Sequence, residues 1–518
     1  MRSARVTLLV VALTSTNARA TTCQDLAGLS LPQTKIESAA SVTPPFKAGS
    51  QDAFGTVTVQ RPFCRVAGTI APAIRFEVWL PVTPEWNGKL QGVGNGGVAG
   101  TINYASLGAA LERGYATVSS DLGHEGGFID FKFAVGHPEL VKDWGYRATH
   151  EMTEKAKAIV QAFYGSPPAH SYFTGCSGGG RQGLMEAQRY PADYDGIVAG
   201  DPTSDFTRLT LGGRLWVAEA TLKDPASYIP AAKIPALAAA VVAACDAQDG
   251  VKDGIIADPR QCRFDPATIQ CKSTDSDNCL TAPQVAAVKK IYGGSTNSKG
   301  ERIFPGYMPG GELGPSGWAS YVSGPAPKKG GQFQYAEGFV RYMVKERPDY
   351  DSLAFDFDRD MPNAIAKLSK DIDAINPDLS AFAARGGKLI QYHGWSDPGV
   401  SPLSSVRYYE SVVRAHDASP SGRPSTKAWH ATQDFYRLFM VPGMQHCVGG
   451  PGPDHFDALA ALENWVEKTT PPDRIVATHL TDGKPDRTRP LCYYPNAAQW
   501  TGKGSADDTA NFVCVSGR

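Results

Sequence analysis

A serine lies between closely spaced glycines in the segment FTGCSGGGRQG, residues 173–183. Gly175, Ser177 and Gly179 fit the pattern G-x-S-x-G, and Cys176 directly precedes the serine. An apolar, strand-like stretch comes before this segment and a helix-like stretch after it, which is the sequence context of a nucleophile elbow. We expect Ser177 to be a nucleophile; the alternative is a serine in an ordinary glycine-rich turn.

Two later loops carry residues that could activate this serine. A serine hydroxyl is a weak nucleophile near neutral pH, so it needs a base within hydrogen-bond reach and an acid that orients the base. In α/β hydrolases these residues follow in the order Ser, Asp or Glu, His, each in a loop after a core strand. Asp397 follows the strand-like KLIQY, and His446 follows the strand-like YRLFMVPG in a glycine-rich loop. We therefore expect Ser177, Asp397 and His446 to form a catalytic triad.

Both partners of the serine have rivals. An aspartate before a proline is often only a turn residue, which is the alternative for Asp397. His393 also follows KLIQY, but it precedes Asp397 and is better explained as support for that loop. The remaining histidines lack the strand–loop context, and we expect structural or solvated roles for them. They are His124, His137, His150, His170, His416, His430, His455 and His479.

An oxyanion hole requires backbone N–H groups aimed at the developing negative charge. Gly178, the residue after the serine, is expected to supply one donor. The glycine-rich loop GVGNGGVAG, residues 92–100, is expected to supply the other from Gly96 or Gly97. A plain tight turn is the alternative. No helix-opening G-x-G-x-x-G follows, so a dinucleotide-binding loop is not expected.

The chain has 518 residues and 42% hydrophobic content, enough to bury sizeable cores. Its net charge of −1 gives no electrostatic reason to expect nucleic acid or a membrane surface as a partner. Residues 1–20 have a basic start, an apolar run and a small-x-small cleavage site, the pattern of a secretory signal peptide. No later stretch is expected to span a membrane. We expect an exported protein, periplasmic or extracellular, and by default a monomer.

Strand-like and helix-like stretches alternate from about residue 70 to 200, which predicts an α/β fold. Within this region, apolar residues at helical spacing predict a helix over 148–164. The alternation stops between 203 and 384, where glycine- and proline-rich segments dominate, and it returns afterwards. We expect a discontinuous catalytic domain, residues 21–202 and 385–518, with a lid domain inserted at 203–384.

An even number of cysteines, ten, in an exported chain favours five disulfides. Short loops close at the lowest entropic cost, so local order suggests three pairs. These are Cys245 with Cys262, Cys271 with Cys279, and Cys492 with Cys514. Cys176 precedes Ser177 and Cys447 follows His446, so a nucleophile and base that meet in space would bring these two cysteines together as well. The alternative is a free reactive thiol beside the serine.

The motifs GCSGGGRQG, HGWSDP and GMQHC together resemble the tannase and feruloyl esterase family of α/β hydrolases. The resemblance also includes GNGG, YRATHE and YPADYDGIVAG and extends over almost the whole mature chain. It implies an α/β-hydrolase fold with a large inserted lid, the triad named above, and a disulfide linking Cys176 to Cys447. The last free pair, Cys23 with Cys64, would then fix the N-terminus.

The resemblance also implies a structural calcium site in the lid, in the segment CDAQDGVKDGII. The implied ligands are the carboxylates of Asp246, Asp249 and Asp253 and the carbonyls of Val251 and Ile255. Ca²⁺ prefers several hard oxygen ligands in a flexible loop, and this segment offers them, although its spacing is not that of an EF-hand. A solvated acidic turn is the alternative.

The family resemblance implies a serine esterase that forms an acyl-enzyme and needs no catalytic cofactor. The expected substrates are aromatic, phenolic acid esters, free or attached to plant polysaccharide or polyphenol. We expect feruloyl or other hydroxycinnamoyl esters first; gallate esters (tannase) and a terephthalate monoester are the alternatives. The lid aromatics Trp318, Tyr321 and Phe339 are candidates to stack on the substrate ring. A non-catalytic binding protein on a hydrolase scaffold is the alternative from a different class.

Overall fold

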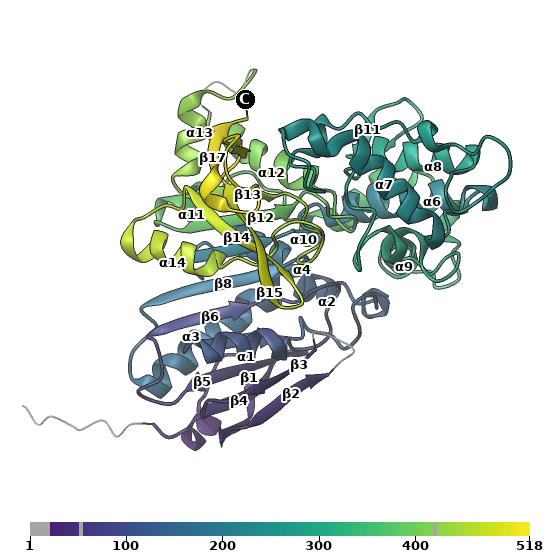
Figure 1. Cartoon of the computed structure of the whole chain (residues 1–518). Coiled ribbons are helices and arrows are strands. Elements are labelled where there is room, and N and C mark those ends of the chain that lie inside the picture. The colour runs from purple at the N-terminus through teal and green to yellow at the C-terminus, as the bar shows by residue number, and fades with distance from the viewer. Residues whose placement is uncertain (1–20, 51–54, 418–421, 518) are drawn as a thin grey trace, which may run out of the picture.

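The computed structural model describes residues 21–50, 55–417 and 422–517, so the expected signal peptide lies outside the described residues. A nine-stranded sheet forms the centre, with the strand order β1-β4-β5-β7-β6-β8-β9-β12-β13 (Figure 1). Its strands are β1 (Thr34–Val42), β4 (Phe63–Ile70), β5 (Ile74–Pro81), β7 (Ala116–Ser120), β6 (Lys89–Val93), β8 (His170–Cys176), β9 (Gly196–Gly200), β12 (Lys388–Gly394) and β13 (Tyr436–Val441). From β1 to β7 in this order neighbouring strands are antiparallel, and from β7 to β13 they are parallel.

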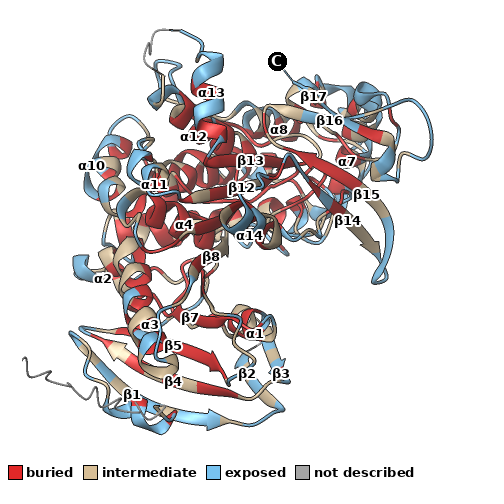
Figure 2. Ribbon diagram, turned by 90° about the vertical axis from the view of Figure 1, so that its left-hand side faces the viewer, coloured by how far each residue is buried: buried red, intermediate tan, exposed pale blue. Residues whose placement is uncertain are grey.

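Helices cover both faces of this sheet. One face packs against α3 (Ala148–Tyr164), α4 (Gly178–Arg189) and α12 (Pro402–Ala415), and the other against α1 (Tyr104–Glu112) and α14 (Ala458–Lys468). Strands enclosed in this way are buried along their whole length, as in the apolar β9 and in β13. Figure 2 shows the central strands and α4 in the buried colour and much of β1, at the sheet edge, as exposed. This is the α/β-hydrolase arrangement that the sequence predicts.

The helix predicted over 148–164 is α3, with the same bounds. Its apolar face buries Met152, Ala156 and Ile159, and the helix ends at Gly165, which adopts a left-handed conformation with φ 78°. A residue without Cβ takes that conformation without steric cost, so glycine terminates the helix here.

The chain between β9 and β12 leaves the sheet and forms a largely helical segment (Figure 1). It contains α5 (Phe206–Arg208), α6 (Trp216–Leu222), α7 (Ile234–Cys245), α8 (Ala282–Gly293), α9 (Gly331–Gly338), α10 (Asp360–Ile372), α11 (Ser380–Ala384) and the short ribbon β10 (Ser295–Thr296) and β11 (Arg302–Phe304). A separate apolar core joins α6, α7 and α8, whereas residues from α9 to α11 pack into the core under α3 and α4. Phe206, Leu211 and Leu215 at the start of the segment join the same core, so the segment is anchored to the sheet at both of its ends.

One helical stretch in this segment, Pro225–Asp249, is long and apolar enough to cross a membrane by length and composition, which the sequence reading did not expect. The core helix of a soluble protein passes the same test, so the finding is weak evidence for a membrane span. In this stretch α7 buries Ile234, Leu237 and Val241 against the lid core.

The remaining elements lie at the periphery. They are β2 (Phe46–Ser50), β3 (Gly55–Val59), α2 (Pro138–Lys142), α13 (Thr426–Gln433), β14 (Arg474–Thr481), β15 (Lys484–Cys492), β16 (Asn496–Trp500) and β17 (Phe512–Ser516). All five predicted disulfides are present, and the described residues include no free cysteine. Cys23–Cys64 fastens the N-terminal segment to β4, and Cys492–Cys514 joins two C-terminal hairpins.

Candidate active site

Ser177 occupies the sharp turn between β8 and α4. Its backbone has φ 62° and ψ −117°, a region that costs a non-glycine residue energy and that is typical of a nucleophile elbow. The glycines around it allow the strand and helix to touch: a Cβ on Gly175 would lie 2.6 Å from the Gly179 carbonyl, and one on Gly180 would lie 2.3 Å from the Gly200 carbonyl oxygen. The turn therefore holds the serine hydroxyl at the carboxyl edge of the parallel strands.

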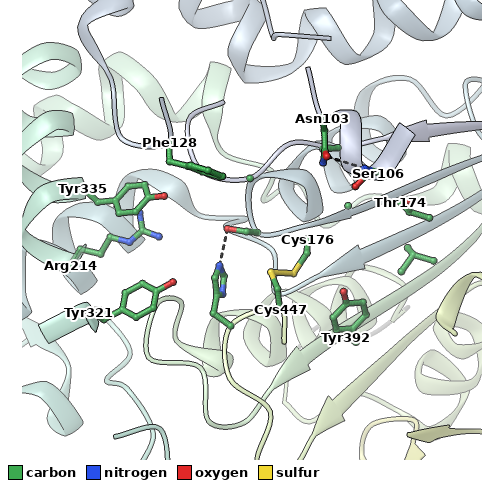
Figure 3. A pocket seen from close by; sticks show the side chains of 17 residues that line it. Asn103, Ser106, Phe128, Thr174, Cys176, Arg214, Tyr321, Tyr335, Tyr392 and Cys447 are labelled. Carbon is green, nitrogen blue, oxygen red and sulfur yellow. Dashed lines mark hydrogen bonds between the residues drawn. A yellow bond between two sulfur atoms is a disulfide. The ribbon is translucent and has the colours of Figure 1, made fainter. Parts of the chain in front are cut away.

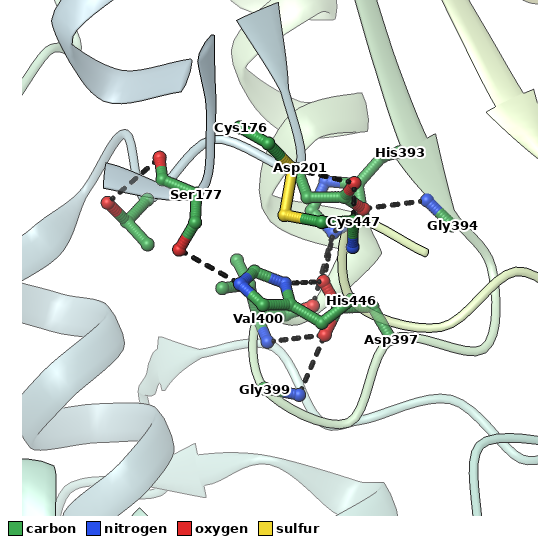
Figure 4. The surroundings of a disulfide bond; sticks show 11 residues. Cys176, Ser177, Asp201, His393, Gly394, Asp397, Gly399, Val400, His446 and Cys447 are labelled. Atoms are coloured by element: carbon green, nitrogen blue, oxygen red, sulfur yellow. Dashed lines mark hydrogen bonds and ion pairs between the residues drawn. A yellow bond between two sulfur atoms is a disulfide. The ribbon is translucent and has the colours of Figure 1, made fainter. Parts of the chain in front are cut away.

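The three predicted triad residues form one hydrogen-bonded line (Figure 4). His446 Nε2 lies 2.9 Å from Ser177 Oγ, and His446 Nδ1 lies 2.6 Å from Asp397 Oδ2. Asp397 follows β12 and His446 follows β13, so neighbouring parallel strands deliver the acid and the base to the same edge as the serine. This arrangement can move a proton from the serine to the histidine.

Asp397 is buried, and backbone N–H groups and two histidines stabilise its negative charge. Its Oδ1 accepts hydrogen bonds from the N–H groups of Gly399 at 2.7 Å and Val400 at 2.9 Å. Burial alone would raise the pKa of this carboxyl, but His446 and His393 outweigh it and hold the pKa well below its usual range. Asp397 is therefore an ionised acceptor that fixes the orientation of the His446 ring.

The pKa of His446 moves in the opposite direction. Burial lowers the pKa of this imidazole, but the attraction and hydrogen bond of Asp397, together with the attraction of Asp201, outweigh it, and the net result is a pKa above the usual value. A base with a raised pKa accepts the serine proton more readily, provided that the pH is high enough to leave it neutral at the start.

A second His–Asp pair lies behind the triad. His393 Nε2 is 3.2 Å from Asp397 Oδ2, and its Nδ1 is 2.7 Å from the Ser405 hydroxyl oxygen. The structure therefore places His393 as a support for the acid loop, the role that the sequence suggested. Asp201 accepts hydrogen bonds from the N–H groups of Gly394 at 2.8 Å and Cys447 at 3.2 Å, and so connects the acid strand to the histidine loop.

Sequence reasoning missed Asp201. Burial raises the pKa of its carboxyl to about 6, and the nearby His393 opposes this shift. One sequence feature pointed to it: Asp201 directly follows strand β9, just as Ser177 follows β8 and Asp397 comes after β12. Nothing in the sequence separated it from the ordinary turn aspartates.

The disulfide between Cys176 and Cys447 joins the elbow to the histidine loop (Figure 4). Its Cα atoms lie 6.0 Å apart, although the residues are separated by 271 positions in sequence. Each cysteine is the direct neighbour of a triad residue, so the bond ties the backbone of the nucleophile to that of the base.

Gly96 and Gly97, predicted for the oxyanion hole, line the cavity at Ser177, and Gly178 begins α4 directly after the serine. A Cβ on Gly178 would lie 2.8 Å from the Gly97 carbonyl oxygen, so the loop after β6 touches the start of α4. Within residues 21–50, 55–417 and 422–517, no acceptor is found for the backbone N–H groups of these three glycines. They remain available for the negative charge of a tetrahedral intermediate.

A cavity of about 500 Å³ opens in front of Ser177 (Figure 3). Arg214, Tyr321 and Tyr335 line it from the lid, Phe128 lines it from the loop after β7, and small and polar side chains such as Ser106 and Thr174 line the side opposite the lid. A volume of this size accommodates an aromatic ester.

Of the three predicted stacking residues, Tyr321 lines this cavity, and its ring meets that of His446 edge to face at a centroid distance of 6.4 Å. The predictions for Trp318 and Phe339 are wrong. Trp318 is 1% exposed and packs against Tyr292 in the lid core, and Phe339 is fully buried against Phe131 and Phe206. Composition identified an aromatic-rich lid but could not tell which rings face the substrate.

The predicted calcium ligands all belong to the loop after α7. Burial and mutual repulsion raise the pKa of the Asp249 and Asp253 carboxyls, so extra positive charge would stabilise the loop. Asp246 Oδ1 accepts hydrogen bonds from the N–H groups of Asp253 at 3.2 Å and Gly254 at 3.0 Å, which closes the loop. Arg489 forms an ion pair with Asp253 and supplies part of that charge. The donor set fits a hard cation, which would share the Asp253 carboxylate with this guanidinium.

Comparisons with known proteins agree with the geometry. The family model for tannase and feruloyl esterase matches residues 56–515. An uncharacterized esterase of Xanthomonas campestris pv. campestris is 43% identical over 99% of this chain and 94% of its own. The mono(2-hydroxyethyl) terephthalate hydrolase of Piscinibacter sakaiensis is 34% identical over 88% of this chain and 85% of its own.

Solved structures show the same fold. The crystal structure of feruloyl esterase B from Aspergillus oryzae superposes with a TM-score of 0.85 at 30% identity, over 95% of this chain and 99% of that chain. The matched family and these relatives extend over the sheet, the inserted segment and the cavity between them. The chain therefore belongs to the tannase and feruloyl esterase family, and it is a carboxylic ester hydrolase with the α/β-hydrolase fold.

Proposed function

We propose that the chain is an exported serine esterase that hydrolyses esters of aromatic acids through an acyl-enzyme on Ser177. The observation that carries this proposal is the unbroken line from Ser177 Oγ through His446 to the ionised Asp397. The open cavity in front of that line supports it, because a substrate can reach the serine.

In the first half-reaction, Ser177 Oγ attacks the ester carbonyl carbon while His446 Nε2 takes the hydroxyl proton. The carbonyl oxygen becomes negatively charged, and the N–H groups of Gly178 and of Gly96 or Gly97 stabilise it. The bond to the alcohol oxygen then breaks, and His446 gives its proton to the leaving alcohol. Asp397 holds the ring orientation and stabilises the imidazolium throughout.

In the second half-reaction, a water molecule takes the place of the alcohol. His446 removes a proton from this water, whose oxygen attacks the acyl carbon. The tetrahedral intermediate collapses, the bond to Ser177 Oγ breaks, and His446 returns the proton to the serine. The products are the free acid and the resting enzyme.

Aromatic acyl groups are the proposed substrates because Tyr321, Tyr335 and Phe128 offer ring faces and edges in the cavity. Feruloyl and other hydroxycinnamoyl esters come first, and similarity to feruloyl esterase B supports them. Gallate esters are the second candidate and terephthalate monoesters are the third. Similarity to the Piscinibacter hydrolase supports the third candidate. A non-catalytic binding protein would have no need of the paired Asp397 and His446.

Export, a monomeric state and attachment of the substrate to plant polysaccharide or polyphenol are parts of the same proposal. Five disulfides support export, since such bonds persist in oxidising compartments. Ca²⁺ is proposed as a structural ion of the lid. Asp246, Asp249 and Asp253, with the carbonyls of Val251 and Ile255, would hold it, and its charge would offset the repulsion of the carboxylates.

The test is hydrolysis of methyl ferulate, methyl gallate and monomethyl terephthalate by the wild type and by Ser177→Ala. Turnover of at least one ester by the wild type, with a loss of more than about 10³-fold in the variant, is expected for a nucleophile. Equal turnover by the two proteins would refute the mechanism, and no turnover of any of the three by the wild type would refute the aromatic-ester proposal.

A further inference from the structure

Arg214 is a buried cation in the wall of the catalytic cavity. It lies on the helical turn η4 (Leu209–Leu215), where the chain enters α6, and only 3% of its surface is exposed. It lines the cavity that also contains Ser177 and His446. No other Lys or Arg and no Asp or Glu is among the described residues that line this cavity, so its charge faces the substrate space without a neutralising carboxylate.

The guanidinium has almost no compensation from the protein. Its Nε and Nη1 atoms are buried without a hydrogen-bond partner among the described residues. Among the described residues its contacts are with aromatic rings: the guanidinium carbon lies 4.1 Å from the Tyr335 centroid and 6.0 Å from the Phe206 centroid. Burying a charge without an ionic or hydrogen-bonded partner is unfavourable, and a single cation–π contact recovers only part of that cost. An anionic ligand in the cavity would supply the missing acceptors.

The position of Arg214 relative to the serine fits a role in substrate recognition. Figure 3 shows its guanidinium between the rings of Tyr335 and Tyr321, across the cavity from Ser106 and Thr174. Tyr321 meets the His446 ring edge to face, and Tyr321, Arg214 and Tyr335 line the same wall of the cavity. A ring that extends from Ser177 towards this wall therefore approaches the Arg214 charge.

We infer that Arg214 binds a carboxylate carried by the substrate, so that the enzyme prefers esters with a free acid group over their neutral counterparts. This inference rests on the proposed function and narrows it. Arg214 presents several N–H donors in a planar fork that matches a carboxylate with two hydrogen bonds. A neutral phenol oxygen in the same place accepts a weaker hydrogen bond, so it offsets less of the cost of burying the Arg214 charge.

The carboxylate has two chemical sources, which matched substrates distinguish. On the acyl side, monomethyl terephthalate is compared with dimethyl terephthalate. On the alcohol side, chlorogenate, an ester of an aromatic acid with a hydroxy acid, is compared with its methyl ester. In each pair only the distal charge changes, while the ester to be cleaved stays the same.

The variants are Arg214→Gln and Arg214→Lys, and Arg341→Gln is the control. Arg341 is a lid arginine that pairs with Glu337 and the Tyr350 carbonyl and does not line the cavity. For the wild type and the control we expect kcat/KM to favour the acid in at least one pair. Arg214→Gln should raise KM for that acid by about 10–100-fold, because a charge-assisted hydrogen bond is lost. It should change kcat/KM for the neutral partner by less than about threefold. Arg214→Lys should recover part of the preference.

Two results would overturn the inference: no preference for the acid in either pair, or an equal loss for acid and neutral esters in Arg214→Gln. The second would mean that Arg214 acts on catalysis through its charge near His446, whose pKa it lowers. Calorimetric binding of monomethyl and dimethyl terephthalate to Ser177→Ala keeps the test independent of turnover. The monomethyl ester, which has the free carboxylate, should bind about 10-fold or more tightly, and equal binding would refute the role of Arg214 even if the proposed esterase activity failed.

Discussion

Cys176 and Cys447 form a disulfide across 271 positions of sequence, and each is the direct neighbour of a residue in the Ser177–His446 hydrogen bond. That hydrogen bond joins two loops from different strands, β8 and β13, which the sheet places several strands apart. A covalent bond between the two backbones limits how far the serine and the imidazole can separate. The disulfide is thus part of the geometry on which catalysis depends.

Removing this disulfide should therefore lower activity as well as stability. We expect the double variant Cys176→Ser, Cys447→Ser to lose about 2–5 kcal/mol of unfolding free energy and at least tenfold in kcat. The double variant Cys492→Ser, Cys514→Ser, which opens a bond between peripheral hairpins, is the control and should lose stability while keeping kcat. Thermal unfolding and steady-state kinetics at a temperature where both variants are folded check this. An unchanged kcat in the first variant would show that the bond only stabilises the fold.

Replacing the acid should disable the base without removing it. In Asp397→Asn the amide cannot stabilise the imidazolium, and it favours the wrong ring tautomer of His446. We expect kcat to fall by about 10³–10⁴-fold with little change in KM. Asp486→Asn breaks a comparable pair, with His479 at 2.7 Å in the exposed C-terminal hairpin, and should leave kcat unchanged. A loss below about tenfold in Asp397→Asn would mean that another group orients the base.

The pH dependence of the reaction should report the raised pKa of His446. The base must be neutral to accept the serine proton, so kcat/KM for a neutral ester is expected to be full at high pH and to fall as the pH drops through this pKa. Because Asp397 raises the pKa, the midpoint should lie above about 6.5, the ordinary histidine value. Asp201 also raises it, so Asp201→Asn should move the midpoint to lower pH. A wild-type midpoint below 6.5 would contradict the electrostatics described here.

Removing metal ions from the protein tests whether the lid loop after α7 binds Ca²⁺. If Ca²⁺ binds Asp246, Asp249 and Asp253, a chelator should lower the melting temperature, and added Ca²⁺ should restore it, since an ion that binds only the folded state stabilises that state. Asp249→Asn should melt at a lower temperature in the presence of Ca²⁺ and respond little to the chelator. Asp277→Asn, at an exposed lid position, should behave as the wild type. A wild type whose melting temperature is the same with chelator and with Ca²⁺ would refute the site.

The catalytic residues were predictable because the sequence immediately around each of them specifies its backbone structure. The elbow needs glycines on both sides of Ser177, and the acid and base each follow an apolar strand, so the spacing of apolar and small residues located all three. The Cys176–Cys447 pairing followed from the same logic, since two cysteines beside two residues that must meet are themselves brought together.

The cavity lining was not predictable in the same way. Lid helices such as α9 and the turn η4 carry apolar and aromatic side chains on more than one face, so their spacing does not reveal which face is turned to the serine. Trp318 and Phe339 were expected at the substrate and are core residues, while Arg214 and Asp201 were overlooked. Arginine and aspartate side chains are usually solvated, and only the three-dimensional packing shows that Arg214 is buried in the cavity wall and that Asp201 is buried behind the triad.

The most direct test of the account is to locate the nucleophile by covalent labelling. A fluorophosphonate, which reacts with a serine activated by a neighbouring base, should add a single label to the wild type, and peptide mass spectrometry should place it on Ser177. Ser177→Ala should take up no label, and His446→Ala should react at least about 10³-fold more slowly because the base is missing. A label on another residue, or equal labelling of Ser177→Ala, would contradict the central claim.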